Sequence, residues 1–225
     1  PLEALDLLHD AFHAPDGDKR TLVANRFQRV LERYATIEQL RSWVAAGGSV
    51  HLFDNVMYVL SLKLMRRHRF SEALAGFDRV LEHASPGLEM ACRWPRRGRE
   101  VGTEEFYGAV ARQREACRWF AAREAAASRP GDEEGRGALL QEMGRRCFRE
   151  ADLFANCLYY PVVVRTDDPT LGSDFGKARR RPSSLEDIHD GNHYRQAAEF
   201  FQRAARECPS YGRLAEVEYS IPLCL

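Results

Sequence analysis

The stretch "GFDRVLEHASP" (residues 76–86) recurs in weaker form at two other places in the chain. The sequence reads "RFQRVLERYAT" at 26–36 and "FFQRAARECPS" at 200–210. Each copy combines an aromatic residue, an arginine, a small apolar residue and a charged tail over the length of a short helix. Self-similarity at periods of about 20 to 50 residues is typical of solenoid architectures. The sequence therefore indicates a repeated helical unit.

Helical periodicity dominates the rest of the chain, because apolar residues recur at three- and four-residue spacing between helix caps and breakers. Thr36 and Gln39 form a capping-box pattern, and Gly47 ends the helix that they open. The breaks between helices are short, which favours antiparallel helix pairs, and almost no strand is predicted. The predicted helices cover about 2–14, 18–35, 36–46, 50–67, 71–84, 103–128, 137–160, 194–208 and 211–219.

Two stretches do not read as helices. Residues 85–102 form a loop by their Pro and Gly content, and residues 161–184, "PVVVRTDDPTLGSDFGKARRRPSS", are turn-rich and polar. We expect the second stretch to be a long loop or arm that becomes ordered on a neighbouring protein. The predicted organisation is thus a helical repeat region (1–160), the arm (161–184) and a C-terminal helical repeat segment (185–225).

Two of the predicted helices share a spacing of small and aromatic residues. A small residue is followed by an aromatic residue four positions later, by a second small or β-branched residue three positions after that, and then by a proline. The two sets are Ala73, Phe77, Val80 and Pro86, and Ala197, Phe201, Ala204 and Pro209. This spacing resembles the second helix of a tetratricopeptide repeat or of the related pentatricopeptide repeat.

The resemblance implies an all-α fold, an irregular α-solenoid of antiparallel helix pairs. In such pairs the small residue permits close approach and the aromatic residue fills the gap to the next pair. It covers about two motifs, roughly a third of the chain. The aromatic positions Phe27, Phe77, Phe120 and Phe201 are separated by 50, 43 and 81 residues, whereas a regular array repeats about every 34. An irregular helical bundle is the alternative.

Charge and composition exclude some classes of protein. The 33 basic and 33 acidic side chains balance, which excludes a protein whose main role is to coat nucleic acid. The sequence contains no run of eighteen apolar residues, so it predicts no membrane-spanning helix. The six cysteines form no C-x-x-C pair, so we expect reduced, mostly buried thiols and an intracellular setting. The basic side chains are nearly all arginine, since only Lys19, Lys63 and Lys177 are lysines. The chain begins at Pro1 without a methionine, so we expect either that a leader has been removed, as in a mitochondrial or other organellar matrix, or that the chain is a portion of a longer protein.

Three basic clusters are the candidate contacts for a partner or for phosphate, because arginine binds carboxylate and phosphate groups bidentately. Trp94 in the second cluster can stack on a base or on an arginine. Solvated loop charges are the alternative interpretation. The clusters comprise Arg66, Arg67 and Arg69; Trp94, Arg96, Arg97 and Arg99; and Lys177, Arg179, Arg180 and Arg181.

Signatures of enzymes are weak. The "SDFG" stretch at 173–176 lacks the other kinase motifs, and His189 and His193 lack a third metal ligand. We therefore predict no catalytic activity, no metal and no cofactor. The expected function is a scaffold or adaptor subunit that contacts other protein subunits of a larger assembly. The alternative is an RNA-contacting subunit of a ribonucleoprotein, such as an organellar ribosome or an RNA-processing complex. Val59 stands at the base-reading position of the central repeat, which disfavours sequence-specific readout.

Overall fold

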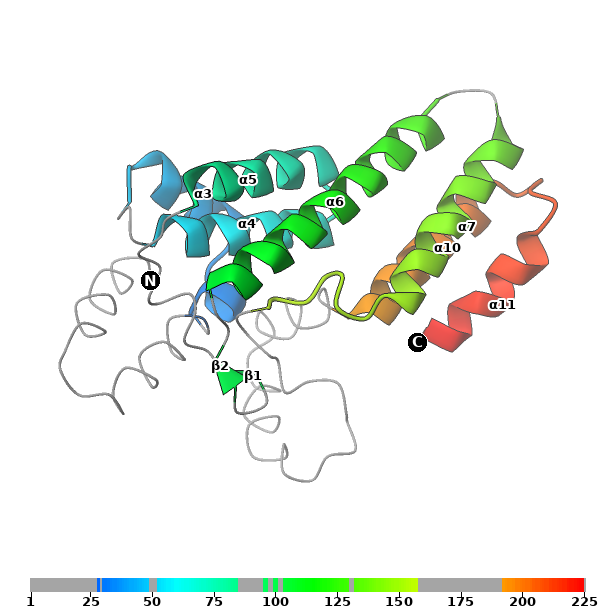
Figure 1. Cartoon of the computed structure of the whole chain (residues 1–225). Coiled ribbons are helices and arrows are strands. Elements are labelled where there is room, and N and C mark those ends of the chain that lie inside the picture. The colour runs from blue at the N-terminus through cyan, green and yellow to red at the C-terminus, as the bar shows by residue number, and fades with distance from the viewer. Residues whose placement is uncertain are drawn as a thin grey trace.

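The computed structural model describes residue 28 and residues 30–48, 52–84, 95–96, 99–100, 103–129, 132–157 and 192–224. As predicted, the regular elements among these residues are helices, apart from two short strands that pair antiparallel (Figure 1). The elements are the π-helical turn η1 (Val30–Tyr34), α3 (Ile37–Ala45), α4 (Phe53–Arg66), α5 (Phe70–His83), β1 (Pro95–Arg96), β2 (Arg99–Glu100), α6 (Thr103–Ala127), α7 (Glu133–Arg149), α10 (His193–Glu207) and α11 (Leu214–Cys224).

The helix ends follow the local capping residues. The capping box predicted at the start of α3 is confirmed: Gln39 N donates to Thr36 Oγ1 at 3.2 Å, and Thr36 N donates to Gln39 Oε1 at 2.9 Å. Gly47 follows α3 with a positive φ of 72°, a conformation in which glycine carries no Cβ penalty. Asn192 caps α10 through a hydrogen bond from Tyr194 N to its side chain at 2.9 Å.

The helices pack in chain order. The structure shows α3 against α4, α4 against α5, α5 against α6, and α6 against α7 (Figure 1). After the segment between α7 and α10, the same order continues, since α10 packs against α7, and α11 packs against α10 and α7. The part of 185–225 that the structure describes therefore packs on the helices that precede it in the chain.

Close helix contacts occur where glycine faces a larger side chain. A Cβ added to Gly76 of α5 would stand 2.1 Å from Ser61 Oγ of α4. A Cβ on Gly144 of α7 would stand 2.6 Å from the Phe201 ring of α10. The burial expected of the motif residues is found, because all of them are buried in these helix contacts. They are Ala73, Phe77, Val80, Ala197, Phe201 and Ala204.

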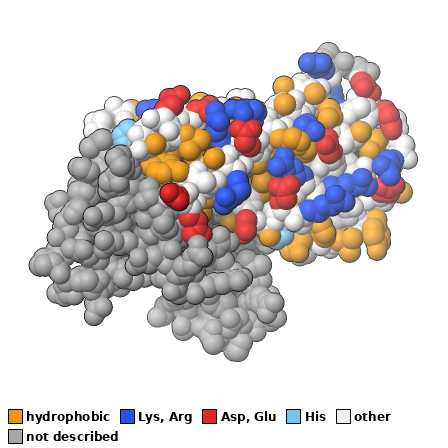
Figure 2. Space-filling view, in the orientation of Figure 1, with side chains coloured by type: hydrophobic (Ala, Val, Ile, Leu, Met, Phe, Trp, Pro, Cys, Tyr) orange, Lys and Arg blue, Asp and Glu red, His pale blue; other side chains and the backbone are white. Residues whose placement is uncertain are grey.

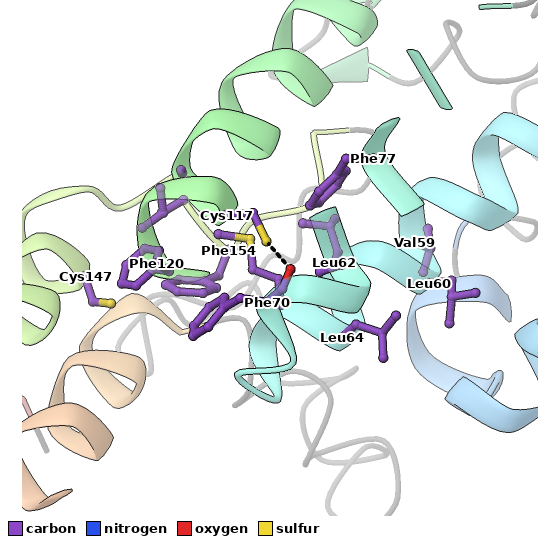
Figure 3. Packing of buried hydrophobic residues seen from close by; sticks show 14 of the residues in the cluster. Val59, Leu60, Leu62, Leu64, Phe70, Phe77, Cys117, Phe120, Cys147 and Phe154 are labelled. Carbon is purple, nitrogen blue, oxygen red and sulfur yellow. Dashed lines mark hydrogen bonds between the residues drawn. The ribbon is translucent and has the colours of Figure 1, made fainter. Parts of the chain in front are cut away.

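Stacked aromatic rings connect α5 and α6 to α10. The Phe70 and Phe120 rings lie 5.1 Å apart, and the Phe120 and Phe200 rings lie 5.7 Å apart, both pairs close to parallel. His68, in the turn between α4 and α5, stacks on Phe200 at 4.4 Å. Figure 3 shows the Phe70, Phe120 and Phe154 rings together, beside the hydrogen bond from Cys117 Sγ to the Phe70 carbonyl. The core is thus continuous from α4 to α10.

One predicted helix was wrong at both ends. We predicted a helix over 137–160, but α7 begins at Glu133 and ends at Arg149, and an irregular segment follows over Glu150–Cys157. Asp132 caps the earlier start, because its side chain accepts a hydrogen bond from Gly135 N at 2.7 Å. In the irregular segment, backbone carbonyls accept hydrogen bonds from side chains of α4 and α6 instead of from backbone N–H groups of a helix. Arg66 Nε donates to the Phe154 carbonyl at 2.9 Å, and Gln113 Nε2 donates to the Ala155 carbonyl at 2.7 Å.

The last helix also differs from its prediction. We expected a short helix at 211–219 that ended before Pro222, whereas α11 continues to Cys224 with Pro222 inside it. A proline near the end of a helix removes only one of the final backbone hydrogen bonds, so the helix tolerates it there better than at its centre. The helix predicted over 2–14, most of the one over 18–35, and the arm over 161–184 lie outside the described residues.

Candidate interaction surface

Helix α11 is covered by the protein on one side. Val217 and Cys224 are buried where α11 packs against α10 and α7. Successive residues of a helix are rotated by about 100°, so a second set of apolar residues of α11 lies together on the opposite side. Tyr219 is 70% exposed and Leu223 is 57% exposed. The exposed set, called the α11 face below, comprises Ala215, Tyr219, Pro222 and Leu223.

Two glutamates border the α11 face, one on each edge. Glu216 lies on the edge toward α7 and is neutralised there: Arg145 Nη2 donates to its Oε2 at 2.9 Å, and Arg213 Nε donates to its Oε1 at 3.1 Å. Glu218 lies on the other edge and is exposed, with no ion pair to any residue that the structure describes. The surface is therefore an apolar stripe with an uncompensated negative charge along one side.

Other exposed apolar side chains lie on neighbouring helices. Four of the five large apolar side chains that are exposed among the described residues belong to α7, α10 and α11: Phe148, Tyr194, Tyr219 and Leu223. The Phe148 and Tyr194 rings contact each other, with centroids 5.1 Å apart. Figure 2 shows hydrophobic side chains gathered along the lower edge of the molecule where α11 ends. Exposed apolar surface that gathers in one place marks an interaction site.

The first predicted arginine cluster, Arg66, Arg67 and Arg69, is only partly exposed. We predicted Arg66 as a contact for a partner or for phosphate in the turn between two helices, but Arg66 is the last residue of α4 and only 4% exposed, so it is not placed to bind a partner. Arg69 donates two hydrogen bonds to Glu72, at 2.7 and 2.8 Å. His68 stacks in the core, whereas Arg67 is exposed. The physical reason is that the turn packs on α10 instead of projecting into solvent.

Arg66 belongs to a buried polar group that we call the Glu32 cluster: Glu32, Lys63, Arg66 and Asn156. Arg66 donates to Glu32 Oε1, Asn156 Nδ2 donates to Glu32 Oε2 at 3.1 Å, and Lys63 Nζ donates to the Glu32 carbonyl at 2.7 Å. Burial raises the pKa of the Glu32 carboxyl, but the Arg66 and Lys63 charges and the Asn156 hydrogen bond outweigh it, so this pKa lies below its usual value. The cluster ties η1, α4 and the irregular segment together.

The other predicted contacts are described only in part. Arg96 and Arg99 face each other in the β1–β2 ribbon, and their side chains lie outside the described set. The remaining candidates, Trp94, Arg97, Lys177, Arg179, Arg180 and Arg181, lie outside the described residues, as does His189. Their role as contacts for RNA or for an acidic partner stays a prediction.

The buried Asp54 carboxylate lies in the first turn of α4, at the opposite end of this helix from Arg66. Asp54 Oδ1 lies 2.6 Å from His83 Nδ1, and the Tyr107 hydroxyl donates to Asp54 Oδ2 at 2.7 Å. A carboxylate–imidazole pair serves catalysis where a nucleophile or a substrate group stands at the other ring nitrogen. In the described part of the chain, no hydrogen bond to His83 Nε2 is found. Through its contacts with His83 and Tyr107, Asp54 links α4 to α5 and α6.

The thiols are poorly suited to nucleophilic chemistry. Burial raises the pKa of Cys117 to about 12, and it also raises the pKa of Cys147, so both stay protonated at neutral pH. Cys117, Cys147, Cys208 and Cys224 form no disulfide. Over the described ranges, no three His, Cys, Asp or Glu side chains are grouped to hold a metal ion. None of the described helices has both the length and the apolar character needed to cross a bilayer.

No protein-family model matches the chain, and neither a curated protein nor a solved structure matches it significantly. The resemblance to tetratricopeptide and pentatricopeptide repeats therefore stays a prediction from the residue spacing. The geometry alone supports the functional interpretation that follows.

Sequence reasoning missed the α11 face, although a signal was present. Ala215, Tyr219 and Leu223 recur every four residues, and Val217, Ile221 and Cys224 recur at similar spacing on the other side. The packing of α11 inside the protein covers one of these two apolar sides and leaves the other exposed. We took the helix to end before Pro222, which removed Leu223 from this pattern.

Proposed function

We propose that the chain is a non-enzymatic scaffold or adaptor subunit that binds another protein of a larger assembly through the α11 face. The observation that carries this proposal is the exposure of Tyr219 and Leu223 on a helix whose opposite side is buried. Burying a side chain the size of Leu is worth about 1.5 to 3 kcal/mol relative to leaving it in water. A partner that covers the α11 face gains this free energy.

The order of helix packing supports a solenoid-like scaffold. In an α-solenoid, each helix pair contacts mainly its neighbours along the chain. The contacts here follow chain order from α3 to α7. We propose that the chain is an irregular α-solenoid of antiparallel pairs, in which α4 with α5 and α7 with α10 form the closest contacts.

A protein partner is better supported than RNA. Arg66 and Val59, two residues relevant to an RNA surface, are buried. Arg69 is already paired with Glu72. Trp119, a candidate stacking ring, carries the Arg123 guanidinium 3.6 Å from its ring centroid. If the loop arginines nevertheless bind phosphate, changing Arg96, Arg97 and Arg99 together weakens RNA retention and lowers its salt dependence.

Affinity purification of the full chain from its native cells tests the proposal. The variant carries Tyr219→Asp and Leu223→Asp, and the control carries Tyr34→Asp, which places one aspartate at an exposed aromatic position of η1. We expect the α11 variant to lose at least one stoichiometric protein partner that the wild type and the control retain, at unchanged melting temperature. Recovery of the same proteins with all three chains would refute the proposal.

A further inference from the structure

We infer that the α11 face binds an amphipathic helix of a different protein, one that carries Lys or Arg beside its apolar stripe. This inference rests on the proposed function, and it adds the shape and the charge of the partner segment. The shape follows from the geometry of the α11 face, and the charge follows from the glutamates at its edges.

The geometry of the α11 face favours a helix over an extended peptide. The stripe from Ala215 to Leu223 runs along α11 for about 12 Å, at a rise of 1.5 Å per residue. A helix has satisfied its own backbone hydrogen bonds, so α11 offers no edge that an extended peptide can pair with. A second helix brings its backbone already satisfied and packs its side-chain ridge against such a stripe. The neighbours of α11 inside the protein are helices as well.

The charges at the edges select a basic partner. Glu216 is already compensated by Arg145 and Arg213, but Glu218 has no ion pair within the described residues. A Lys or Arg that lies beside the apolar stripe of the partner would pair with Glu218, whereas an acidic side chain there would be repelled. The exposed glutamate therefore provides specificity, and the apolar stripe provides most of the affinity.

A second copy of this chain does not meet the same requirement through α11. The helix from Leu214 to Cys224 contains two glutamates and no Lys or Arg. When a twofold axis pairs two copies of one helix in antiparallel orientation, equal edges meet, so Glu218 would face Glu218 of the second copy. Like charges in direct contact oppose such a dimer.

Photo-crosslinking from the α11 face tests the inference directly. We would replace Tyr219 with p-benzoylphenylalanine in the full chain, irradiate the native cells, and identify the crosslinked peptide by mass spectrometry. We expect a peptide from another protein whose sequence has helical apolar periodicity with Lys or Arg beside the stripe. A peptide from a second copy, an acidic or extended segment, a nucleic acid, or the absence of any crosslink would overturn the inference.

Charge reversal at the edge provides a second readout. Glu218→Lys should lower the crosslinking yield about five- to tenfold, because it places like charges together. Glu82→Lys, a charge reversal at an exposed position of α5, is the matched control and should leave the yield unchanged. If Glu218→Lys has no effect while Tyr219→Asp with Leu223→Asp still loses the partner, the basic-helix inference fails and the proposed function stands. If the aspartate pair loses no partner, the proposed function itself fails.

Discussion

The Arg66 guanidinium and the Glu32 carboxylate form an ion pair in the protein interior, where both side chains are almost fully buried. Arg66 also donates through Nε to the Phe154 carbonyl, so one side chain joins α4 to η1 and to the irregular segment. Breaking a buried ion pair by removing one member costs more than the pair itself contributes, because the remaining charge is left without compensation. This asymmetry leads to the first prediction.

Glu32→Gln should lower the free energy of unfolding by about 3 to 5 kcal/mol, since the buried Arg66 charge loses its partner. The double variant Glu32→Leu with Arg66→Met removes both charges and should recover a large part of that loss. Urea denaturation of the wild type, Glu32→Leu, Arg66→Met and the double variant gives the coupling free energy. Additive losses from the two single changes would show that the pair is not coupled.

Stability should fall as the pH decreases below about 6.5, in part because of His68. Burial lowers the pKa of His68 below 6.5, although the hydrogen bond with Gln196 and the nearby Glu199 oppose this effect. In the pH range between the folded value and 6.5, the unfolded chain binds a proton that the folded protein excludes, so acid favours unfolding. Above pH 6.5 the contribution of His68 does not change with pH.

Melting temperatures between pH 7.5 and 5.5 measure this effect. His68→Asn keeps a residue that tolerates the positive φ of 56° at this position but removes the titrating ring. We expect a smaller loss of stability on acidification for His68→Asn than for the wild type. His193→Asn should act in the same direction, because burial lowers the pKa of His193 as well. An unchanged pH dependence in His68→Asn would contradict the account of its burial.

The close contact between α7 and α10 predicts opposite effects for two Gly→Ala changes. Gly144→Ala should destabilise the protein by about 1 to 3 kcal/mol, because its Cβ would stand 2.6 Å from the Phe201 ring. Gly108→Ala in α6 should stabilise it by about 0.5 to 1 kcal/mol, since its Cβ would meet only Arg112 Nη1 at 3.6 Å. Both values come from urea denaturation. A neutral or stabilising effect of Gly144→Ala would show that α7 and α10 separate easily to make room for the added methyl group.

Phe77 and Tyr219 should differ sharply in their importance for folding. Phe77 is fully buried, with its ring 6.3 Å from the Tyr58 ring, so Phe77→Ala should cost about 3 to 5 kcal/mol. Tyr219→Ala should change the free energy of unfolding by less than about 0.5 kcal/mol, because the isolated chain leaves this ring in water. A large cost at Tyr219 would give the α11 face a role in folding instead of binding.

Local features of the fold were predictable from the sequence. The capping box of Thr36 and Gln39 and the end of α3 at Gly47 depend on residues close together in the chain. The burial of Ala73, Phe77, Ala197 and Phe201 follows from helical periodicity, because the helix places these residues on one side whatever their partners. Such features need no knowledge of distant segments.

Features that depend on distant residues could not be predicted in the same way. Arg66 is buried because Glu32 and the Phe154 carbonyl accept its hydrogen bonds, and these partners lie 34 and 88 residues away. The helix predicted through residue 160 stops at Arg149, and Gln113 and Arg66 bind the carbonyls of the segment that follows. An arginine-rich turn reads as solvent-facing until its acceptors are known.

Hydroxyl-radical footprinting of Tyr219 tests the central claim most directly, because it reports whether the α11 face is covered in the native assembly. Tyr34, exposed on η1 and away from the proposed interface, is the internal reference. We predict that Tyr219 is oxidised readily in the isolated chain and at least several-fold more slowly in the native assembly, while Tyr34 changes little. Equal oxidation of Tyr219 in both states would show that the α11 face stays in water, and the proposed function would be wrong.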